Sequence, residues 1–125
     1  MRIVYDIDGT LDLDLWSTWS HLPMGRRFMN PSINPSKVKY IITGRPEKYR
    51  KYTMNVLKQM GIIPKVMFMN PLGILDQPYV FKMKAAYLNI LNADVYVDDD
   101  PIWKFKFRKF WDGIIIDSTE LGRYV

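Results

Sequence analysis

Five short apolar runs, rich in β-branched residues, recur along the chain and constrain its fold more than any other feature. They are Arg2 to Tyr5, Val38 to Ile42, Val66 to Met69, Val95 to Val97 and Ile114 to Ile116. Their length and composition predict buried strands. Each run ends in polar residues, so the same pattern also marks where functional side chains would emerge.

Segments with helical spacing lie between these runs. Pro46 and Glu47 suit a first helical turn, where a missing N–H and a negative charge are both favourable. Gly61 is expected to end that helix as its C-cap. A second helix is predicted from about Val80 to Leu91, and a shorter third one after Pro101. The residues expected to face inward from the third helix are Trp103, Phe107 and Phe110 or Trp111.

This alternation predicts an α/β fold, a three-layer Rossmann-like sandwich around a mainly parallel sheet of about five strands. In such sheets the active residues gather at the carboxyl ends of the strands. The 125 residues suit one domain. Within it, residues 12–37 combine two tryptophans, several Pro and Gly residues and the pair Arg26 and Arg27 without periodicity. This stretch is predicted to be a short lid inserted over the active face.

Composition excludes some classes of site and partner. The chain has no cysteine and one histidine, His21, which excludes disulfides, thiolate zinc sites and multi-histidine metal sites. No apolar run reaches the length of a signal peptide or a membrane span, so we expect a soluble, cytoplasmic protein. The net charge of +5 would attract an anionic partner. A basic surface is nevertheless more often merely solvated.

The strongest motif is the run from Val4 to Thr10, where a strand leads directly into Asp6 and Asp8. Gly9 lets the chain turn and bring both carboxylates into one pocket. Two acids so close repel each other unless a cation lies between them or one is protonated. An all-oxygen site suits Mg²⁺. The alternative interpretation is an acidic strand-to-turn junction without a ligand.

A second acidic group, Asp98, Asp99 and Asp100, follows the strand at Val95 to Val97. Three adjacent carboxylates are costly without compensation, which indicates a divalent cation. The alternative is a solvated acidic turn, in which Asp100 caps the helix that begins at Pro101.

Two further groups could bind phosphate. Thr43, Gly44 and Arg45 follow the second predicted strand and offer a hydroxyl, backbone N–H groups and a cation, with a helix N-terminus expected directly behind them. Near the start of the second helix, Lys82 and Lys84 could reach an anion at the sheet edge. Alone, each of these signals is weak, because helical lysines are usually solvated.

Together, the ordered motifs DIDGT, TGR, a helical lysine and DDD resemble the haloacid dehalogenase (HAD) phosphatase superfamily, from Asp6 to Asp99. The resemblance implies that Asp6 attacks phosphorus to form an aspartyl-phosphate. Asp8 would protonate the leaving group and then activate water. Thr43 would bind the transferring phosphoryl group.

The resemblance also implies a lysine and a metal site. Lys84 would steady the charge shared by Asp6 and phosphate, and it is preferred because KAAYL resembles the family pattern; Lys82 is the alternative. Mg²⁺ would be held by Asp6, Asp98 and the Asp8 backbone carbonyl. Asp99 would be a direct or water-mediated ligand.

The combination of DIDGT, TGRPE and DDDP looks like the polynucleotide phosphatase and nucleotidase branch of the superfamily. The partner would then be a phosphorylated nucleotide or nucleic-acid end, bound at its phosphate by Gly44 and Arg45. The cations that could extend a backbone-binding surface are Arg26, Arg27, Lys48 and Arg50. The aromatic residues that could stack on bases, or simply pack the insertion onto the core, are Trp16, Trp19 and Phe28.

Two other functions stay open at this stage. One is a phosphatase for a nucleoside monophosphate, a sugar phosphate or another small metabolite, with an oligomer partner completing the short lid. The other is a non-catalytic binding module with the same fold. A substrate panel with and without Mg²⁺ separates all three.

Overall fold

The computed structural model describes residues 1–12 and 29–124, and for residues 101–103 it describes the backbone alone. The strands are β1 (Ile3–Tyr5), β2 (Tyr40–Pro46), β3 (Val66–Asn70), β4 (Val95–Val97) and β5 (Ile114–Ile116). The helices are α1 (Arg50–Gln59), α2 (Gln77–Ile90) and α3 (Pro101–Phe107), with 3-10 turns η1 (Pro35–Lys37), η2 (Glu47–Tyr49) and η3 (Ser118–Arg123). Among the described helices, none combines the length and apolar character that a bilayer crossing requires.

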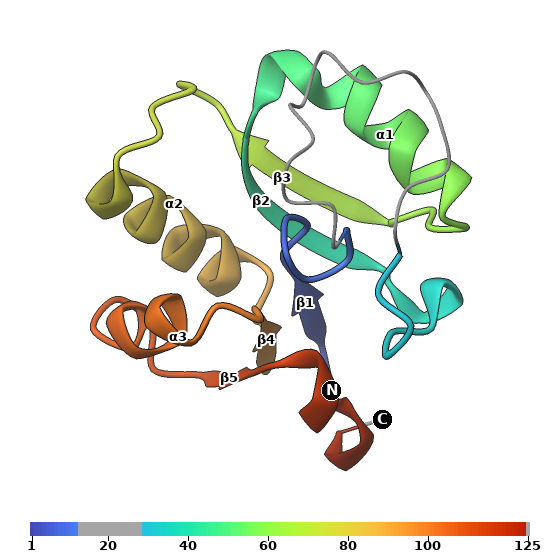
Figure 1. Cartoon of the computed structure of the whole chain (residues 1–125). Helices are drawn as coiled ribbons and strands as arrows, with labels where there is room; N and C mark the ends of the chain where they lie inside the picture. The colour runs from blue at the N-terminus through green and yellow to red at the C-terminus, as the bar shows by residue number, and fades with distance from the viewer. Residues whose placement is uncertain (13–28, 125) are drawn as a thin grey trace.

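The five strands form one parallel sheet in the order β3-β2-β1-β4-β5 (Figure 1). The α/β fold with a five-stranded parallel sheet is therefore confirmed, and the architecture is compatible with a Rossmann-like sandwich. The chain builds outward from β1 in both directions, first to β2 and β3 and later to β4 and β5. The carboxyl ends of β1 and β4 thus form the switch point at which open α/β sheets bind ligands.

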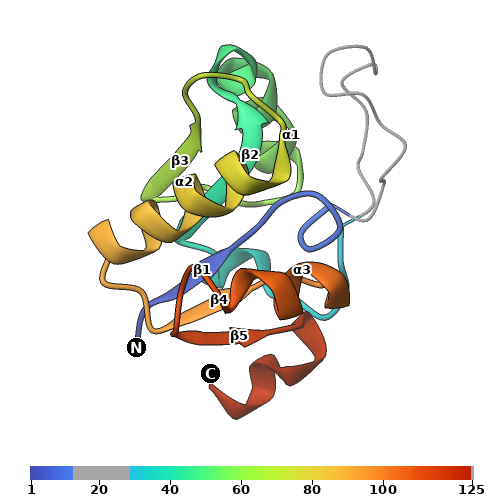
Figure 2. The same cartoon turned by 90° about the vertical axis from the view of Figure 1, so that its left-hand side faces the viewer.

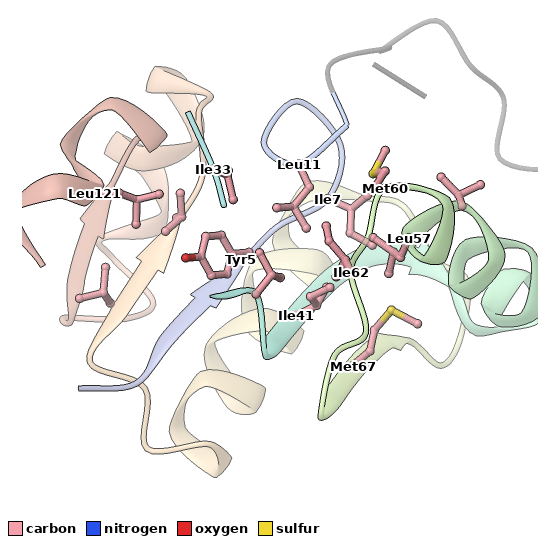
Figure 3. Packing of buried hydrophobic residues seen from close by; sticks show 14 of the residues in the cluster. Tyr5, Ile7, Leu11, Ile33, Ile41, Leu57, Met60, Ile62, Met67 and Leu121 are labelled. Atoms are coloured by element: carbon pink, nitrogen blue, oxygen red, sulfur yellow. The ribbon is translucent and has the colours of Figure 1, made fainter. Parts of the chain in front are cut away.

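Helices cover both faces of the sheet. Helices α2 and α3 lie together on one face and α1 lies on the other, as Figure 2 shows from the side of α2 and α3. Because neighbouring strand residues point to opposite faces, Tyr96 packs with Phe81 and Phe107 on the α2–α3 side. Its neighbours Val95 and Val97 belong to the cluster on the α1 side, which also contains Tyr5 and Leu57 (Figure 3).

The hydrogen bonds at the helix ends explain why particular residues in the sequence predict where helices begin and end. Gly61 has a φ of 83°, and its N–H bonds to Lys58 while the N–H of Ile62 bonds to Leu57. This pair of hydrogen bonds is a Schellman motif, so the predicted C-cap is confirmed. Asn92, with a φ of 51°, ends α2 in the same way. The Asp76 side chain caps the start of α2 by accepting from the N–H of Tyr79.

The second strand and first helix differ from the prediction. Strand β2 starts after the η1 turn and continues through the Thr43–Arg45 segment to Pro46. Its pairing with β3 shifts between Ile42 and Pro46. Pro46 is extended, with a ψ of 142°, and the helix begins only at Arg50 after a 3-10 turn. Proline fixes φ but not ψ, and an extended ψ places Pro46 in the strand.

The expected lid at residues 12–37 is described only at its two ends. Asp12 is buried and forms an isolated bridge with Met29. Asn30 and Ile33 are buried as well, and Ile33 belongs to the core on the α1 side. Asp12, Asn30 and Ile33 therefore pack against the body of the domain, and the lid itself stays a prediction. The remainder of the expected lid lies outside the described residues.

Inward packing of the third helix agrees in part with the prediction. Phe107 and Trp111 are buried in the cluster shared with α2. Phe110 is 36 % exposed, although its ring lies 5.4 Å from that of Phe81. The side chain of Trp103 lies outside the described part. The η3 turn was not predicted, although its Asp117–Glu120 capping box is visible in the sequence.

Candidate active site at the carboxyl ends of β1 and β4

Two buried carboxylates mark the switch point of the sheet. Tyr5 and Val97 are register partners, so Asp6 and Asp98 leave neighbouring strands at corresponding positions. Their side chains line a common cavity of about 230 Å³. The charged residues lining it are Asp6, Asp8, Arg45, Lys84, Asp98 and Asp100, and its wall is completed by Gly44, Leu75 and Val80. Strand register thus joins two motifs that lie far apart in the sequence.

Lys84 is the lysine that reaches this cavity. Its Nζ donates to Asp6 Oδ1 at 3.2 Å and to the Tyr96 hydroxyl at 2.8 Å. Lys84 is 2 % exposed, whereas Lys82 is exposed on the outer side of α2. Burial of an ammonium group is costly unless a carboxylate compensates for it. The contact with Asp6 supplies that compensation, so the structure distinguishes the two candidate lysines.

Tyr96 belongs to the site and was missed by the sequence reading. Its hydroxyl accepts from Lys84 and lies 3.5 Å from Asp98 Oδ2, to which it donates. Burial raises the pKa of Tyr96 well above its usual value, and the charges of Asp6 and Asp98 act in the same direction. The hydroxyl therefore keeps its proton. A tyrosine in the middle of an otherwise aliphatic buried strand was the available signal, because its hydroxyl requires a partner.

Burial makes the ionised forms of Asp6 and Asp98 unfavourable. Burial raises the pKa of Asp6 to about 7; Lys84 opposes this shift, while Asp98 and Asp8 add to it. Burial is also the main cause that raises the pKa of Asp98, again opposed by Lys84. The charge of Lys84 thus lowers the pKa of both buried carboxyl groups. A divalent cation beside them would favour the ionised form of both.

The donor set fits magnesium. Among the described residues, no group of three or more Asp, Glu, His or Cys side chains is close enough to hold a metal ion. Magnesium does not require such a group, because it commonly uses one or two carboxylates and fills its other positions with water and phosphate oxygens. Asp6 and Asp98 follow neighbouring strands and line one cavity, so they could supply these two carboxylates.

Arg45 differs most from its expected role. Instead of facing an incoming phosphate, its guanidinium holds Asp8, with Nε 3.0 Å from Oδ2 and Nη2 2.7 Å from Oδ1. Nη2 also lies 3.7 Å from Asp12 Oδ2. The Arg45 side chain is completely buried, although the residue still lines the cavity. This ion pair joins the end of β2 to the turn that follows β1.

The Thr43 and Gly44 segment is only partly as expected. Thr43 is buried, and its Oγ1 accepts from the N–H of Arg45 at 3.1 Å. Gly44 lines the cavity, but Thr43 is not among the lining residues. Behind Thr43 the chain stays extended to Pro46 and then forms the η2 turn, so α1 begins only at Arg50. The expected phosphate cradle is therefore incomplete in this conformation.

Asp99 also departs from the prediction. Its Oδ1 accepts from the N–H of Ser118 at 2.6 Å, and its Oδ2 accepts from the Ser118 hydroxyl at 3.0 Å and from Asn30 at 3.3 Å. The carboxylate thus ties the end of β4 to η3 and to the residue 30 segment. It does not line the cavity, so the expected ligand role has no support in this geometry. Asp100 does line the cavity, and its N–H donates to Asp98 Oδ1.

The expected nucleic-acid surface is only partly within the described residues. The residues outside them are Arg26, Arg27, Trp16, Trp19 and Phe28. Arg50 forms an ion pair with Glu47 and donates to the Met67 carbonyl. Lys48 is exposed and lies at a second cavity next to the first.

Comparison of the chain with models of protein families, with curated proteins and with solved structures found no match in any of the three. Function must therefore be argued from the chemistry of the site.

Proposed function

We propose that this chain is a magnesium-dependent phosphomonoesterase of the HAD type that forms an aspartyl-phosphate on Asp6. The observation that carries the proposal is the contact of Asp6 with Lys84 in the cavity that Asp98 shares. A carboxylate nucleophile, a buried cation and a second carboxylate suit phosphoryl transfer, because this reaction depends mainly on positioning and charge compensation. The order of motifs along the chain supports the same assignment.

Asp6 and Asp98, with the Asp8 backbone carbonyl, would hold Mg²⁺. When bound, the ion compensates the charge of the phosphoryl oxygens and orients them. Lys84 adds a positive charge fixed against Asp6. Tyr96 holds Lys84 and Asp98 in one hydrogen-bonded chain.

The first step transfers the phosphoryl group to the protein. One carboxylate oxygen of Asp6 forms a bond to phosphorus as the bond between phosphorus and the ester oxygen breaks. Asp8 gives a proton to that leaving oxygen. In the second step water attacks the aspartyl-phosphate, Asp8 takes the water proton, and the bond between phosphorus and Asp6 breaks. Inorganic phosphate leaves, and both aspartates return to their starting states.

The Asp8–Arg45 ion pair corresponds to the second step of this cycle, in which Asp8 takes a proton from water. Both oxygens of Asp8 accept from Arg45, which suits an ionised carboxylate that can take a proton. Donation in the first step requires the protonated form. Asp8 must therefore take up a proton from solvent before the leaving group departs, which weakens its ion pair with Arg45.

The proposed substrate is a nucleotide or a polynucleotide end. The cavity of about 230 Å³ is smaller than the roughly 300–1,000 Å³ of sites that enclose a small molecule. It accommodates the phosphate and leaves the rest of the ester outside. A sugar phosphate or another small metabolite is the competing substrate class, and a binding module without turnover is the competing function.

The test is a panel of nucleoside monophosphates, sugar phosphates and 3′- or 5′-phosphorylated oligonucleotides, with Mg²⁺ or with EDTA. Wild type should release phosphate only with Mg²⁺ and should yield a trapped acyl-phosphate at Asp6. Asp6→Asn should lose turnover and keep its fold, because the amide is nearly isosteric but a poor nucleophile. Asp112→Asn, at an exposed aspartate, is the matched control. Metal-independent turnover, or an active Asp6→Asn variant, would exclude this mechanism.

A further inference from the structure

A second cavity of about 330 Å³ opens next to the first, at the carboxyl ends of β2 and β3. One wall is the turn that includes Pro46, Lys48 and Tyr49, and the other is the loop between β3 and α2. Leu75 lines both cavities and is 57 % exposed. A ligand that fills the first cavity and extends past Leu75 would therefore enter the second cavity.

The loop between β3 and α2 is held in place by a buried side chain. Asn70 Nδ2 donates to the Ile74 carbonyl at 2.7 Å and to the Gly44 carbonyl at 3.3 Å, and its Oδ1 accepts from the N–H of Gly73 at 3.0 Å. Gly73 has a φ of 69°, which favours glycine. Asn70 thus fixes the loop to Gly44, a residue that lines the first cavity. A preformed wall lowers the entropic cost of binding a ligand.

The lining of the second cavity combines charged residues with exposed apolar side chains. Leu72 is 68 % exposed, and Leu75 lies beside it on the same loop. Across the cavity is the half-buried ring of Tyr49, with Lys48 Nζ 5.1 Å from the ring centroid. Exposed apolar side chains around a preformed hollow are typical of ligand sites. Aliphatic and aromatic walls suit the flat face of a base better than the hydroxyls of a sugar.

The charges at the second cavity favour an anionic ligand. Glu47 is the acidic residue of the lining, and it is paired with Arg50. Lys48 is exposed at the same edge. A nucleotide would therefore meet a neutralised carboxylate and one cation.

We propose that the second cavity binds the base of a nucleotide whose phosphate occupies the first cavity. This inference rests on the proposed function for the identity of the phosphate site. The nucleotide is either a free mononucleotide or the terminal residue of a nucleic acid, because both present the same base and phosphate.

The kinetic test compares adenosine 5′-monophosphate, a 5′-phosphorylated oligoadenylate and glycerol phosphate. In Leu72→Ser and in Tyr49→Leu, the ratio of kcat/KM for a nucleotide substrate to that for glycerol phosphate should fall about tenfold, mainly through KM, given the usual strength of base stacking. Ile63→Ser replaces an equally exposed apolar residue, 72 % exposed, outside the lining of either cavity, and should keep the wild-type ratio. A fall for the mononucleotide alone identifies the free nucleotide as the source, and a fall for the oligonucleotide alone identifies the nucleic-acid end.

A binding test separates failure of this inference from failure of the proposed function. Adenosine, which has no phosphate, is titrated into wild type, Leu72→Ser and Ile63→Ser and followed by NMR chemical shifts. Weaker binding in Leu72→Ser alone supports the base site even if no ester is hydrolysed. The inference is overturned if adenosine does not bind and wild type prefers no nucleotide over glycerol phosphate, even when the phosphatase activity itself is present. An unchanged ratio in both cavity variants overturns it as well.

Discussion

At the scale of single residues, two lysines two positions apart have different environments. Lys84 continues the buried row of Val80 and Leu88 at four-residue spacing, so its side chain passes between α2 and the sheet. Lys82 points away from that row and is exposed. The buried position allows the Lys84 side chain to contact the carboxylate of Asp6, just after β1, and the hydroxyl of Tyr96 in β4.

This difference predicts the effect of removing each charge. Lys84→Met should lower kcat/KM for a phosphate ester by about 100-fold or more, the usual cost of losing one fixed donor to developing charge. Lys82→Met is the matched control and should remain near wild type. Steady-state kinetics measures both, and circular dichroism checks that each variant is folded. A similar loss in the two variants would remove Lys84 from the proposed mechanism.

At the scale of elements, the connection into β5 depends on one close contact. The ring of Trp111, which is 6 % exposed, lies directly over Gly113. A Cβ atom built on Gly113 would be 2.1 Å from this ring. The absence of a side chain therefore lets Trp111 pack against α2 and α3 while the chain turns into the strand.

Gly113→Ala should consequently destabilise the protein. Either the indole or the backbone must move, and overpacking of this kind costs about 1–3 kcal/mol. Gly122→Ala is the control, because a Cβ built there has no heavy atom within 4 Å; it should change stability by less than about 0.5 kcal/mol. Urea unfolding of the three proteins gives the comparison. Equal midpoints would show that the contact over Gly113 relaxes without cost.

At the scale of the whole molecule, the site depends on strand order. β1 lies between β2 and β4, so Asp6 is adjacent both to the segment that supplies Arg45 and to the strand that supplies Asp98. Lys84 then approaches from α2 on one face. Four aspartates, Arg45 and Lys84 line the cavity at the switch point, so acidic groups outnumber cations there, and a bound cation would reduce this imbalance.

Mg²⁺ should therefore raise the melting temperature, because it binds the native arrangement and not the unfolded chain. At a free concentration of 100 times Kd the stabilisation is about 2.7 kcal/mol. Asp98→Asn removes one ligand charge and should lose most of this shift, whereas Asp112→Asn should keep it. Thermal unfolding with and without Mg²⁺ tests the metal site independently of turnover. An undiminished shift in Asp98→Asn would place the ion elsewhere.

Much of this arrangement could be predicted from local patterns. The five apolar runs identified the five strands because burial on both faces imposes continuous hydrophobicity. Gly61 identified a helix end because its left-handed conformation favours glycine. Asp6 and Asp98 were found because each follows a strand, and parallel strands bring their carboxyl ends to one edge.

Tertiary structure alone decided which partners the polar side chains take. The sequence does not show that β2 continues past Thr43, or that Arg45, near the end of this strand, binds Asp8 in the turn after β1. Asp98 and Asp99 look equivalent in the chain, yet one lines the cavity and the other binds Ser118. Burial patterns are local, whereas the reach of a charged side chain depends on strand order, register and the elements packed above it. The sequence by itself therefore determined the strands and the acids that follow them. The packing of β1, β2, β4 and α2 determined which side chains those acids contact.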